Sequence, residues 1–267
     1  MTSQTDPSAS GQGPSRKDRR AAERSARKSG SPAPSTSQSS GRSMWLITGA
    51  AIAIALLAIV GLVVVSGGFE EDQLAAVSKP EVPAPAPELR VGRSLGDPQA
   101  PVRIDVYEDP QCPACGLFTE RIEPLLVAGP VTDGQVFLTY KDLPFIGQES
   151  LDAAIAMRVA EELDGKFWDY HQLVFHNQEG ENQGAFTVDR LADMAELLDL
   201  DRTAFLEAME DPAYLEAVQA EAAEGAALQI SSTPSVVVNG EVVTGVPEWE
   251  ALKERIAVAA SGTVDGG

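Results

Sequence analysis

The chain has 267 residues, of which 43% are hydrophobic, a content that allows one large soluble domain or two small ones. It carries 40 acidic and 20 basic residues, and the part after residue 43 has a net charge of −25 because eight of the basic residues and only three of the acidic ones precede it. This charge excludes nucleic acid as a partner, and scattered acids are more typical of a soluble surface than of a site for a basic partner.

The first 66 residues predict a membrane attachment. Residues 1–43 are rich in Ser, Gly, Pro and Arg without apolar clusters, so we expect a disordered tail. Within residues 44–66, the run WLITGAAIAIALLAIVGLVVVS is uncharged, and as a helix it would span about 33 Å, enough to cross a bilayer. A signal peptide has a shorter apolar stretch, so we expect a retained transmembrane helix, although small residues at 66–68 would permit cleavage. The excess of Lys and Arg before the run predicts a cytoplasmic tail, a single pass through the cell membrane and an extracytoplasmic remainder.

The rest of the chain is predicted to hold a linker, one domain and a short tail. Residues 67–89 include SKPEVPAPAPEL, whose alternating Pro and Ala favour an extended linker that holds the folded part away from the membrane. Residues 90–261 have the size and texture of one globular domain, and residues 262–267 are expected to be disordered.

The elements of the domain follow in the order strand, helix, strand, helical block, hairpin, helix. VRIDVYE, over residues 102–108, alternates apolar and polar residues as a strand does. A helix is expected to begin at Pro113 and to kink at Pro124, and QVFLTY predicts the next strand. A helical block is expected over about 147–228. Its expected helix caps are Ser150, Thr187 and Asp201.

The last elements complete an α/β domain. PSVVVNGEVVTG places two β-branched runs around Asn239-Gly240, the strongest short signal for a hairpin. PEWEALKERIAVAA then predicts a helix with Pro247 near its start.

The two cysteines, Cys112 and Cys115, lie in EDPQCPACGLF at the predicted junction of strand and helix. A structural disulfide closing so short a loop would add only about 2 kcal/mol of stability, against nearly 5 for a loop of about 100 residues. A metal site would need His171 and His176, which follow about 55 residues later, against about 12 to 15 in a zinc finger. Each histidine fits better as part of a helix surface or core, and copper handling is the least implausible metal function.

A redox centre accounts for more of these features. A cysteine at a helix N-terminus receives backbone N–H groups and the positive end of the helix dipole, which stabilise the thiolate. We therefore expect Cys112 to be the accessible nucleophile and Cys115, one turn further in, to resolve the mixed disulfide. Thr233-Pro234 precedes a predicted strand, where it is either a plain strand-start proline or a cis turn facing the thiols that leaves backbone groups free to pair with an extended substrate.

With these motifs the chain resembles the DsbA-like branch of the thioredoxin-fold thiol-disulfide oxidoreductases. The resemblance covers Val91 to about Ala260. It is carried, in order, by LGDPQAPVRIDVYEDPQCPACGLF, KDLPF, GKFWDYHQLVFHNQ and STPSVVVNG. It implies a thioredoxin fold of α/β class with an inserted helical subdomain, preceded here by one transmembrane helix. The anchor is similar to that of exported members in bacteria without a conventional periplasm.

Residue by residue, the resemblance implies that Cys112 attacks, that Cys115 is buried and that Pro234 is the cis-proline with Thr233 beside the sulfur. Pro113 and Ala114 complete the motif. The best-known oxidases have His at the position of Ala114, which here removes a donor and a positive charge near the thiolate.

The proton acceptor also departs from the family. Members often carry a buried acid six positions before the first cysteine, where this chain has Val106. Asp105 should point to the opposite face, whereas Glu108 shares the face of Val106 nearer the end of the strand. Glu108 is therefore a weak candidate proton acceptor, and we expect it to be solvated.

The functional prediction is an extracytoplasmic protein-disulfide oxidoreductase, acting as an oxidase on thiols of exported proteins. The resemblance implies re-oxidation by a membrane partner of the DsbB or vitamin K epoxide reductase-like type. No metal or organic cofactor is expected, and no Rossmann or P-loop glycine pattern occurs. A reductase, for example in cytochrome c maturation, remains an alternative, as does a non-catalytic tethered binding or chaperone module on the same scaffold.

Overall fold

A six-stranded mixed sheet organises the domain, with the strand order β1-β2-β4-β3-β5-β6. The computed structural model describes residues 74–81 and 83–262. The strands are β1 (Arg90–Val91), β2 (Ser94–Leu95), β3 (Val102–Glu108), β4 (Val136–Asp142), β5 (Ser235–Val238) and β6 (Glu241–Thr244). The helices are η1 (Pro87–Leu89), α3 (Pro113–Arg121), α4 (Glu123–Leu126), η2 (Val127–Val131), α5 (Gln148–Asp164), α6 (Phe167–His176), α7 (Val188–Leu197), α8 (Arg202–Met209), α9 (Pro212–Ala227) and α10 (Trp249–Ser261).

The central strand β3 pairs parallel to β4 and antiparallel to β5, so that Val106 lies between Tyr140 and Val236. Its observed bounds are those predicted from the alternating pattern. The predicted hairpin is also confirmed, since β5 and β6 pair antiparallel around Asn239, which adopts the positive φ of 46° that such a turn requires.

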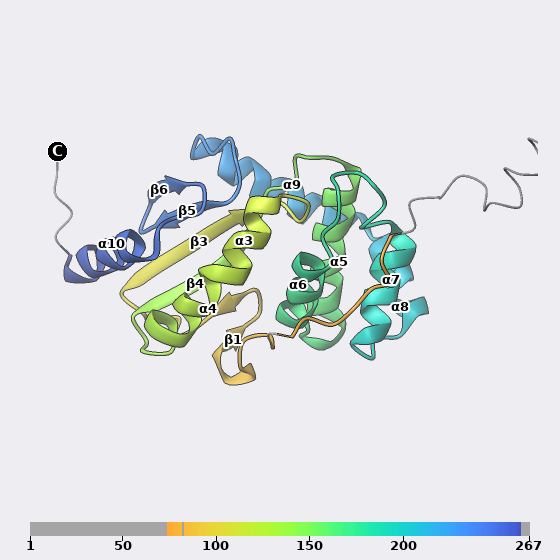
Figure 1. Cartoon of the computed structure of the whole chain (residues 1–267), viewed down its shortest axis with the longest axis horizontal. Coiled ribbons are helices and arrows are strands. Elements are labelled where there is room, and N and C mark those ends of the chain that lie inside the picture. The colour runs from red at the N-terminus through yellow and green to blue at the C-terminus, as the bar shows by residue number, and fades with distance from the viewer. Residues whose placement is uncertain (1–73, 82, 263–267) are drawn as a thin grey trace, which may run out of the picture. The chain divides into compact units, whose positions relative to one another are not determined.

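The helix after β3 begins where the sequence predicts. Pro113 occupies its first turn, where a missing N–H costs nothing, and Cys112 is the N-cap. The helix is interrupted at Ile122 and resumes as α4, in whose first turn Pro124 lies, which confirms the predicted break. Figure 1 shows α3 lying across β3 and β4.

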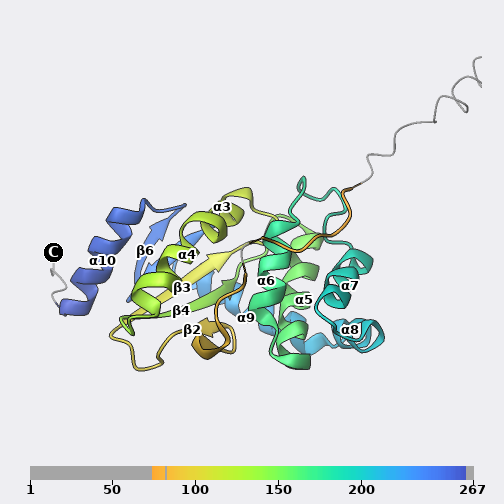
Figure 2. The ribbon, with the colours of Figure 1, turned by 60° about the horizontal axis from the view of Figure 1, so that its bottom comes forward.

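The helical insertion runs from α5 to α9 between β4 and β5, close to the predicted bounds. Figures 1 and 2 show α5 to α8 grouped at one end of the sheet and α10 at the other. Asp201 caps α8 by accepting a hydrogen bond from Ala204 N at 2.9 Å, as predicted. Thr187 has the N-cap position of α7 but makes no side-chain cap bond. The cap prediction for Ser150 is wrong, because α5 begins two residues earlier and Ser150 lies inside it.

The predicted spacer differs from the structure in its described part. Residues 74–81 lie against the insertion instead of standing away from the domain. Ser78 N donates to Asn177 Oδ1 at 2.9 Å, Asn177 Nδ2 donates to Ser78 O at 2.8 Å, and Arg190 Nη1 donates to Ala75 O at 2.9 Å. Paired backbone groups hold this segment in place, which composition alone does not reveal.

Three predictions fall on parts of the chain outside the described residues: the basic tail at 1–43, the transmembrane helix at 44–66 and most of the C-terminal tail at 262–267. Within the described part, no helix has the length and apolar character needed to span a membrane.

Candidate active site

Cys112 lies at the N-cap of α3 with extended backbone angles, φ −70° and ψ 118°. The residue is 8% exposed, so it is less accessible than predicted, and in its thiol form Sγ donates a hydrogen bond to the carbonyl oxygen of Thr233 at 3.4 Å. The pKa of Cys112 is lowered from 9.0 to about 6, chiefly by a hydrogen bond from Cys115, and the first backbone N–H groups of the helix act in the same direction. Partial burial opposes this shift. At neutral pH the thiolate is therefore the main form.

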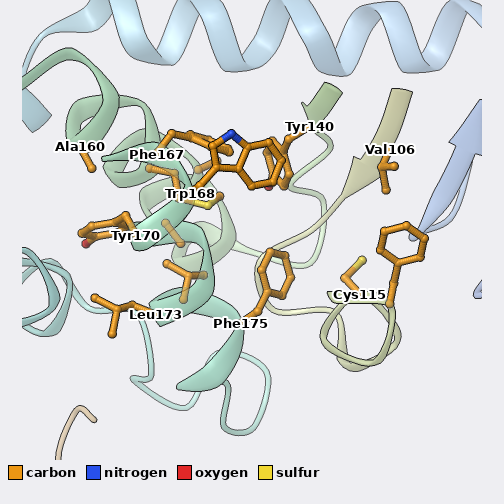
Figure 3. Packing of buried hydrophobic residues seen from close by; sticks show 14 of the residues in the cluster. Val106, Cys115, Tyr140, Ala160, Phe167, Trp168, Tyr170, Leu173 and Phe175 are labelled. Carbon is orange, nitrogen blue, oxygen red and sulfur yellow. The ribbon is translucent and has the colours of Figure 1, made fainter. Parts of the chain in front are cut away.

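Cys115 lies one turn further into α3 and is fully buried. Burial raises the pKa of its thiol, and the hydrogen bond to Cys112 and the charge of Glu108 act in the same direction. Figure 3 shows Cys115 in the packed cluster that also contains Val106 of β3 and Phe175 of α6. Both cysteines are free thiols in this structure. The pKa values of the two thiols are thus shifted in opposite directions, which suits Cys112 as the nucleophile and Cys115 as its protonated partner.

The loop before β5 lies against Cys112. The Thr233–Pro234 peptide bond is cis, as predicted, and both residues are buried. They lie 121 residues from Cys112 in sequence, yet the Thr233 carbonyl contacts its sulfur. Thr233 Oγ1 has no hydrogen-bond partner among the described residues. The fold therefore brings Cys112, Thr233 and Pro234 together. In the first turn of α3, Pro113 is exposed and Ala114 is half-buried against the core.

Glu108 corrects the expectation of a solvated acid, since its side chain is 1% exposed. It is the last residue of β3, where α6 covers the face of the strand, and its Oε2 lies 3.5 Å from His171 Nε2. Burial raises the pKa of Glu108 well above its usual value, and Glu123 and Cys112 add to the effect. Burial therefore favours the protonated form of this carboxyl group.

Two further titratable groups lie beside Glu108, and neither was predicted to take part in the redox reaction. His171 is fully buried, and desolvation lowers its pKa to about 3, so that the ring is neutral. Burial raises the pKa of Glu123 to about 8, although a hydrogen bond from Gln172 opposes the shift. The core placement of His171 was one of its two predicted placements. Glu123 had one signal in the sequence, an acid set among apolar residues in RIEPLL.

Polar side chains hold the loop that carries Cys112. Asp109 is buried and accepts hydrogen bonds from Gln111 N, Ser150 Oγ, Phe145 N and Ile146 N at 2.6 to 2.9 Å. Four donors from three segments thus fix the turn between β3 and α3, because an ionised carboxylate binds such donors strongly.

Gln178, from the segment after α6, acts from the other side of the same loop. Its Nε2 donates to Pro110 O at 2.7 Å and to Cys112 O at 3.0 Å. A side chain at Gly116 would collide with the Gln178 amide, so glycine at this position leaves room for it. The helical insertion therefore positions the backbone of the reactive cysteine.

A groove of about 500 Å³ runs beside the motif between α3 and α6. Its lining includes the exposed side of Pro113, the aromatic ring of Phe175 and the amides of Gln172 and Gln178. In the described part of the chain, no group of three or more His, Cys, Asp or Glu side chains is arranged to hold a metal ion.

Comparison with known proteins agrees with this architecture. A family model described as thioredoxin matches residues 89–257. Disulfide bond formation protein D of Bacillus subtilis is 27% identical over 172 residues, which cover 64% of this chain and 78% of that protein. The crystal structure of oxidised BdbD from Bacillus subtilis superimposes with a TM-score of 0.60 at 24% identity, over 69% of this chain and 100% of that one. DsbA from Chlamydia trachomatis gives a TM-score of 0.55 at 24% identity, over 70% and 99%. The two structural likenesses show the predicted thioredoxin-like fold with its helical content.

Proposed function

The chain belongs to the thioredoxin family and is a protein-disulfide oxidoreductase, and we propose that it works as an oxidase that introduces disulfides into exported proteins. The observation that supports this proposal most strongly is the unequal pair of sulfurs. Cys112 is at the helix start with a pKa of about 6, and Cys115 is buried behind it with a raised pKa. A dithiol of this kind favours attack at one sulfur and release of the other.

The proposed cycle uses only these two sulfurs. In the oxidised enzyme, a substrate thiolate attacks Cys112 Sγ, the Cys112–Cys115 bond breaks, and its electron pair leaves on Cys115, which takes up a proton. A second substrate thiolate then attacks the substrate sulfur of the mixed disulfide, and Cys112 leaves as a thiolate. Two electrons have passed to the enzyme, and the substrate holds a new disulfide.

The cis-proline loop gives the substrate a place to lie. Thr233 and Pro234 flank Cys112, and a proline that cannot donate a ladder hydrogen bond leaves the adjoining backbone open to an extended chain. We propose that a substrate segment pairs with this loop while its cysteine meets Cys112.

The direction of electron flow depends on the stability of the Cys112 thiolate. The helix N-terminus and the Cys115 hydrogen bond stabilise it, which favours the reduced enzyme and hence oxidation of the substrate. A reduction potential near about −120 mV in glutathione buffers would support an oxidase, whereas one near about −270 mV would indicate a reductase.

The proposal extends to location and partner. The apolar run at 44–66 would anchor the domain on the outer side of the cell membrane. A catalytic oxidase needs an electron acceptor after each cycle, and a quinone-coupled membrane protein of the DsbB or vitamin K epoxide reductase-like type would supply it.

The decisive test is oxidation of a reduced, unfolded disulfide protein such as ribonuclease A by the oxidised chain. We expect the wild type to restore ribonuclease activity and Cys112→Ser to show none. A Cys112→Ser variant that retained full function in the cell would indicate a binding or chaperone module instead.

A further inference from the structure

Three buried side chains from three different elements meet in the interior of the domain. Glu108 ends β3, Glu123 begins α4, and His171 lies in the middle of α6. His171 Nε2 lies 3.5 Å from Glu108 Oε2 and 3.9 Å from Glu123 Oε2, so the ring nitrogen faces both carboxyl groups. The imidazole thus occupies the position of a link between the two acids.

Several buried polar atoms in this cluster lack hydrogen-bond partners. Such atoms are rare in native proteins and call for an explanation. Among the described residues, Glu108 Oε1, His171 Nδ1 and the Tyr140 hydroxyl accept or donate no hydrogen bond. A cavity of about 10 Å³ is lined by Glu108, Glu123, Tyr140 and Trp168 among others. Such a space is close to the least that one water molecule needs, and its walls carry the polar groups that a water would bridge.

The cluster reaches the surface on one side. Glu123 Oε1 accepts a hydrogen bond from Gln172 Nε2 at 2.8 Å, and Gln172 also lines the groove between α3 and α6. Movement of this one amide would bring Glu123 into contact with the water of the groove. On the other side, an ionised Glu108 would raise the pKa of Cys115, which places this carboxyl group within electrostatic reach of the buried thiol.

We propose that Glu108, His171 and Glu123 form a proton path that connects Cys115 to the groove, with Gln172 as its outer gate. The path rests on the proposed thiol-disulfide exchange and adds to it the two residues beyond Glu108. It explains how a fully buried thiol exchanges its proton although no solvent reaches it.

The proton balance is simple in both directions. When the Cys112–Cys115 disulfide is opened, the electron pair on Cys115 takes the proton of Glu108. Glu108 regains a proton from Glu123, either through a water in the cavity that both acids line or through His171 Nε2, which first accepts the proton of Glu123 and then passes it to Glu108. Glu123 is then reprotonated from the groove. Re-oxidation runs the same transfers backwards, so that no group keeps a net change.

The groups that face the path come from every surrounding element. They are Cys112 and Cys115 of α3, Tyr140 of β4, Glu108, Glu123 and His171. Tyr140 keeps its proton because burial raises its pKa well above the usual value. No Lys or Arg forms an ion pair with Glu108 or Glu123 among the described residues, so the path holds protons without a fixed positive charge.

The test measures the rate at which dithiothreitol reduces the oxidised protein between pH 5 and 9, divided by the thiolate fraction of the reagent. The wild-type rate should fall as the pH rises through about 8, where Glu123 loses its proton. Glu123→Gln keeps the size of the side chain, and we expect it to slow reduction about tenfold below pH 8 and to remove this inflection. His171→Phe should act alike, since its ring fits among Tyr140, Phe167 and Phe175.

Glu254→Gln, on the exposed face of α10, is the matched control and should behave as the wild type. A Glu123→Gln variant with the wild-type rate and inflection would overturn the path and leave the proposed function intact. A wild-type chain that dithiothreitol does not reduce at all would instead refute the proposed function.

A measurement on the wild type keeps the proposal testable if neither variant folds. In the infrared difference spectrum between oxidised and reduced protein, we expect the bands of two protonated carboxyl groups to shift. A shift of one band would leave Glu108 responding alone and would overturn the path.

Discussion

Two buried acids stand side by side in the sheet and have opposite surroundings. Glu108 of β3 and Asp142 of β4 are register partners at the same ends of parallel strands. Asp142 faces two guanidinium groups, with Arg158 Nε at 2.6 Å and Arg93 Nη1 at 3.6 Å. Glu108 faces a neutral imidazole and has no cation beside it.

Asp142 therefore stabilises the fold through ion pairs, whereas Glu108 is suited to binding and releasing a proton. Glu221 of α9 pairs with both arginines, so the cluster at Asp142 joins β4, α5 and α9 through paired charges. Burial raises the pKa of Asp142, but Arg93 and Arg158 act against this shift, and Arg93 lowers the pKa of Glu221 although burial opposes it. At Glu108 nothing offsets desolvation, and the carboxyl group stays neutral and able to exchange. Paired charges fix structure, whereas an unpaired acid is suited to chemistry.

The largest expected effect is on the paired cluster. Arg158→Ala should lower the free energy of unfolding by about 3 to 5 kcal/mol, because it leaves Asp142 and Glu221 short of a cation in the interior. Chemical denaturation measures this. The control Arg255→Ala removes an exposed pair with Glu241 and should cost about 0 to 1 kcal/mol. Equal losses in the two variants would contradict a structural role for the buried pairs.

Asp109 offers a second comparison, an acid held by neutral donors. Asp109→Asn turns an acceptor into a donor that faces Phe145 N and Ile146 N, so we expect a loss of roughly 3 kcal/mol. The loop carrying Cys112 should loosen as well, seen as faster hydrogen exchange at residues 110–112. Unchanged exchange would show that this carboxylate does not hold the loop.

Unlike the substitutions at Arg158 and Asp109, Glu108→Gln should increase the free energy of unfolding. The folded pKa of Glu108 lies above its unfolded value, so its contribution to stability is present below about pH 4.5 and is lost as the pH rises toward the folded pKa. Gln cannot ionise, and the variant should gain roughly 1 to 2 kcal/mol over the wild type between pH 5 and 8. Denaturation at several pH values measures the difference in the free energy of unfolding between the variant and the wild type. A variant that becomes less stable than the wild type as the pH rises would refute the prediction.

The smallest effect is expected from Ala114→His, which places a group that can carry a positive charge beside Cys112. Ala114→His should lower the pKa of Cys112 below its value of about 6 when the imidazole is protonated. The thiolate, followed by its ultraviolet absorbance, should titrate at lower pH, and the reduction potential should rise by about 30 mV for each 1.4 kcal/mol gained. An unchanged titration would show that the position after Pro113 does not act on the sulfur.

Local patterns predicted the elements of this fold well. The strand at 102–108, the helix from Pro113, the hairpin at Asn239 and the bounds of the insertion follow from periodicity, proline placement and turn chemistry. The cysteine pair was also found in this way, whereas the local pattern left the isomer of the Thr233–Pro234 bond open and the family resemblance implied the observed cis form. These signals lie within a few residues of the features that they predict.

The environment of the thiols was less predictable because it depends on contacts between distant segments. Glu108 ends an alternating strand, and residues of other elements, among them His171 of α6 about 60 residues later, make it buried. Glu123 and Gln178 act through neighbours that no local pattern identifies. The described part of the Pro-rich spacer differs for the same reason, since its partners Asn177 and Arg190 lie far along the chain.

The most direct test of the account is to trap the mixed disulfide. Cys115→Ser removes the thiol that would resolve the mixed disulfide. When this variant meets a substrate disulfide, Cys112 attacks one sulfur, the other sulfur leaves as a thiolate, and mass spectrometry after digestion should find the adduct on Cys112. We expect an adduct in Cys115→Ser and none in Cys112→Ser. Adducts of equal amount in the two variants would contradict the assignment of Cys112 as the attacking sulfur.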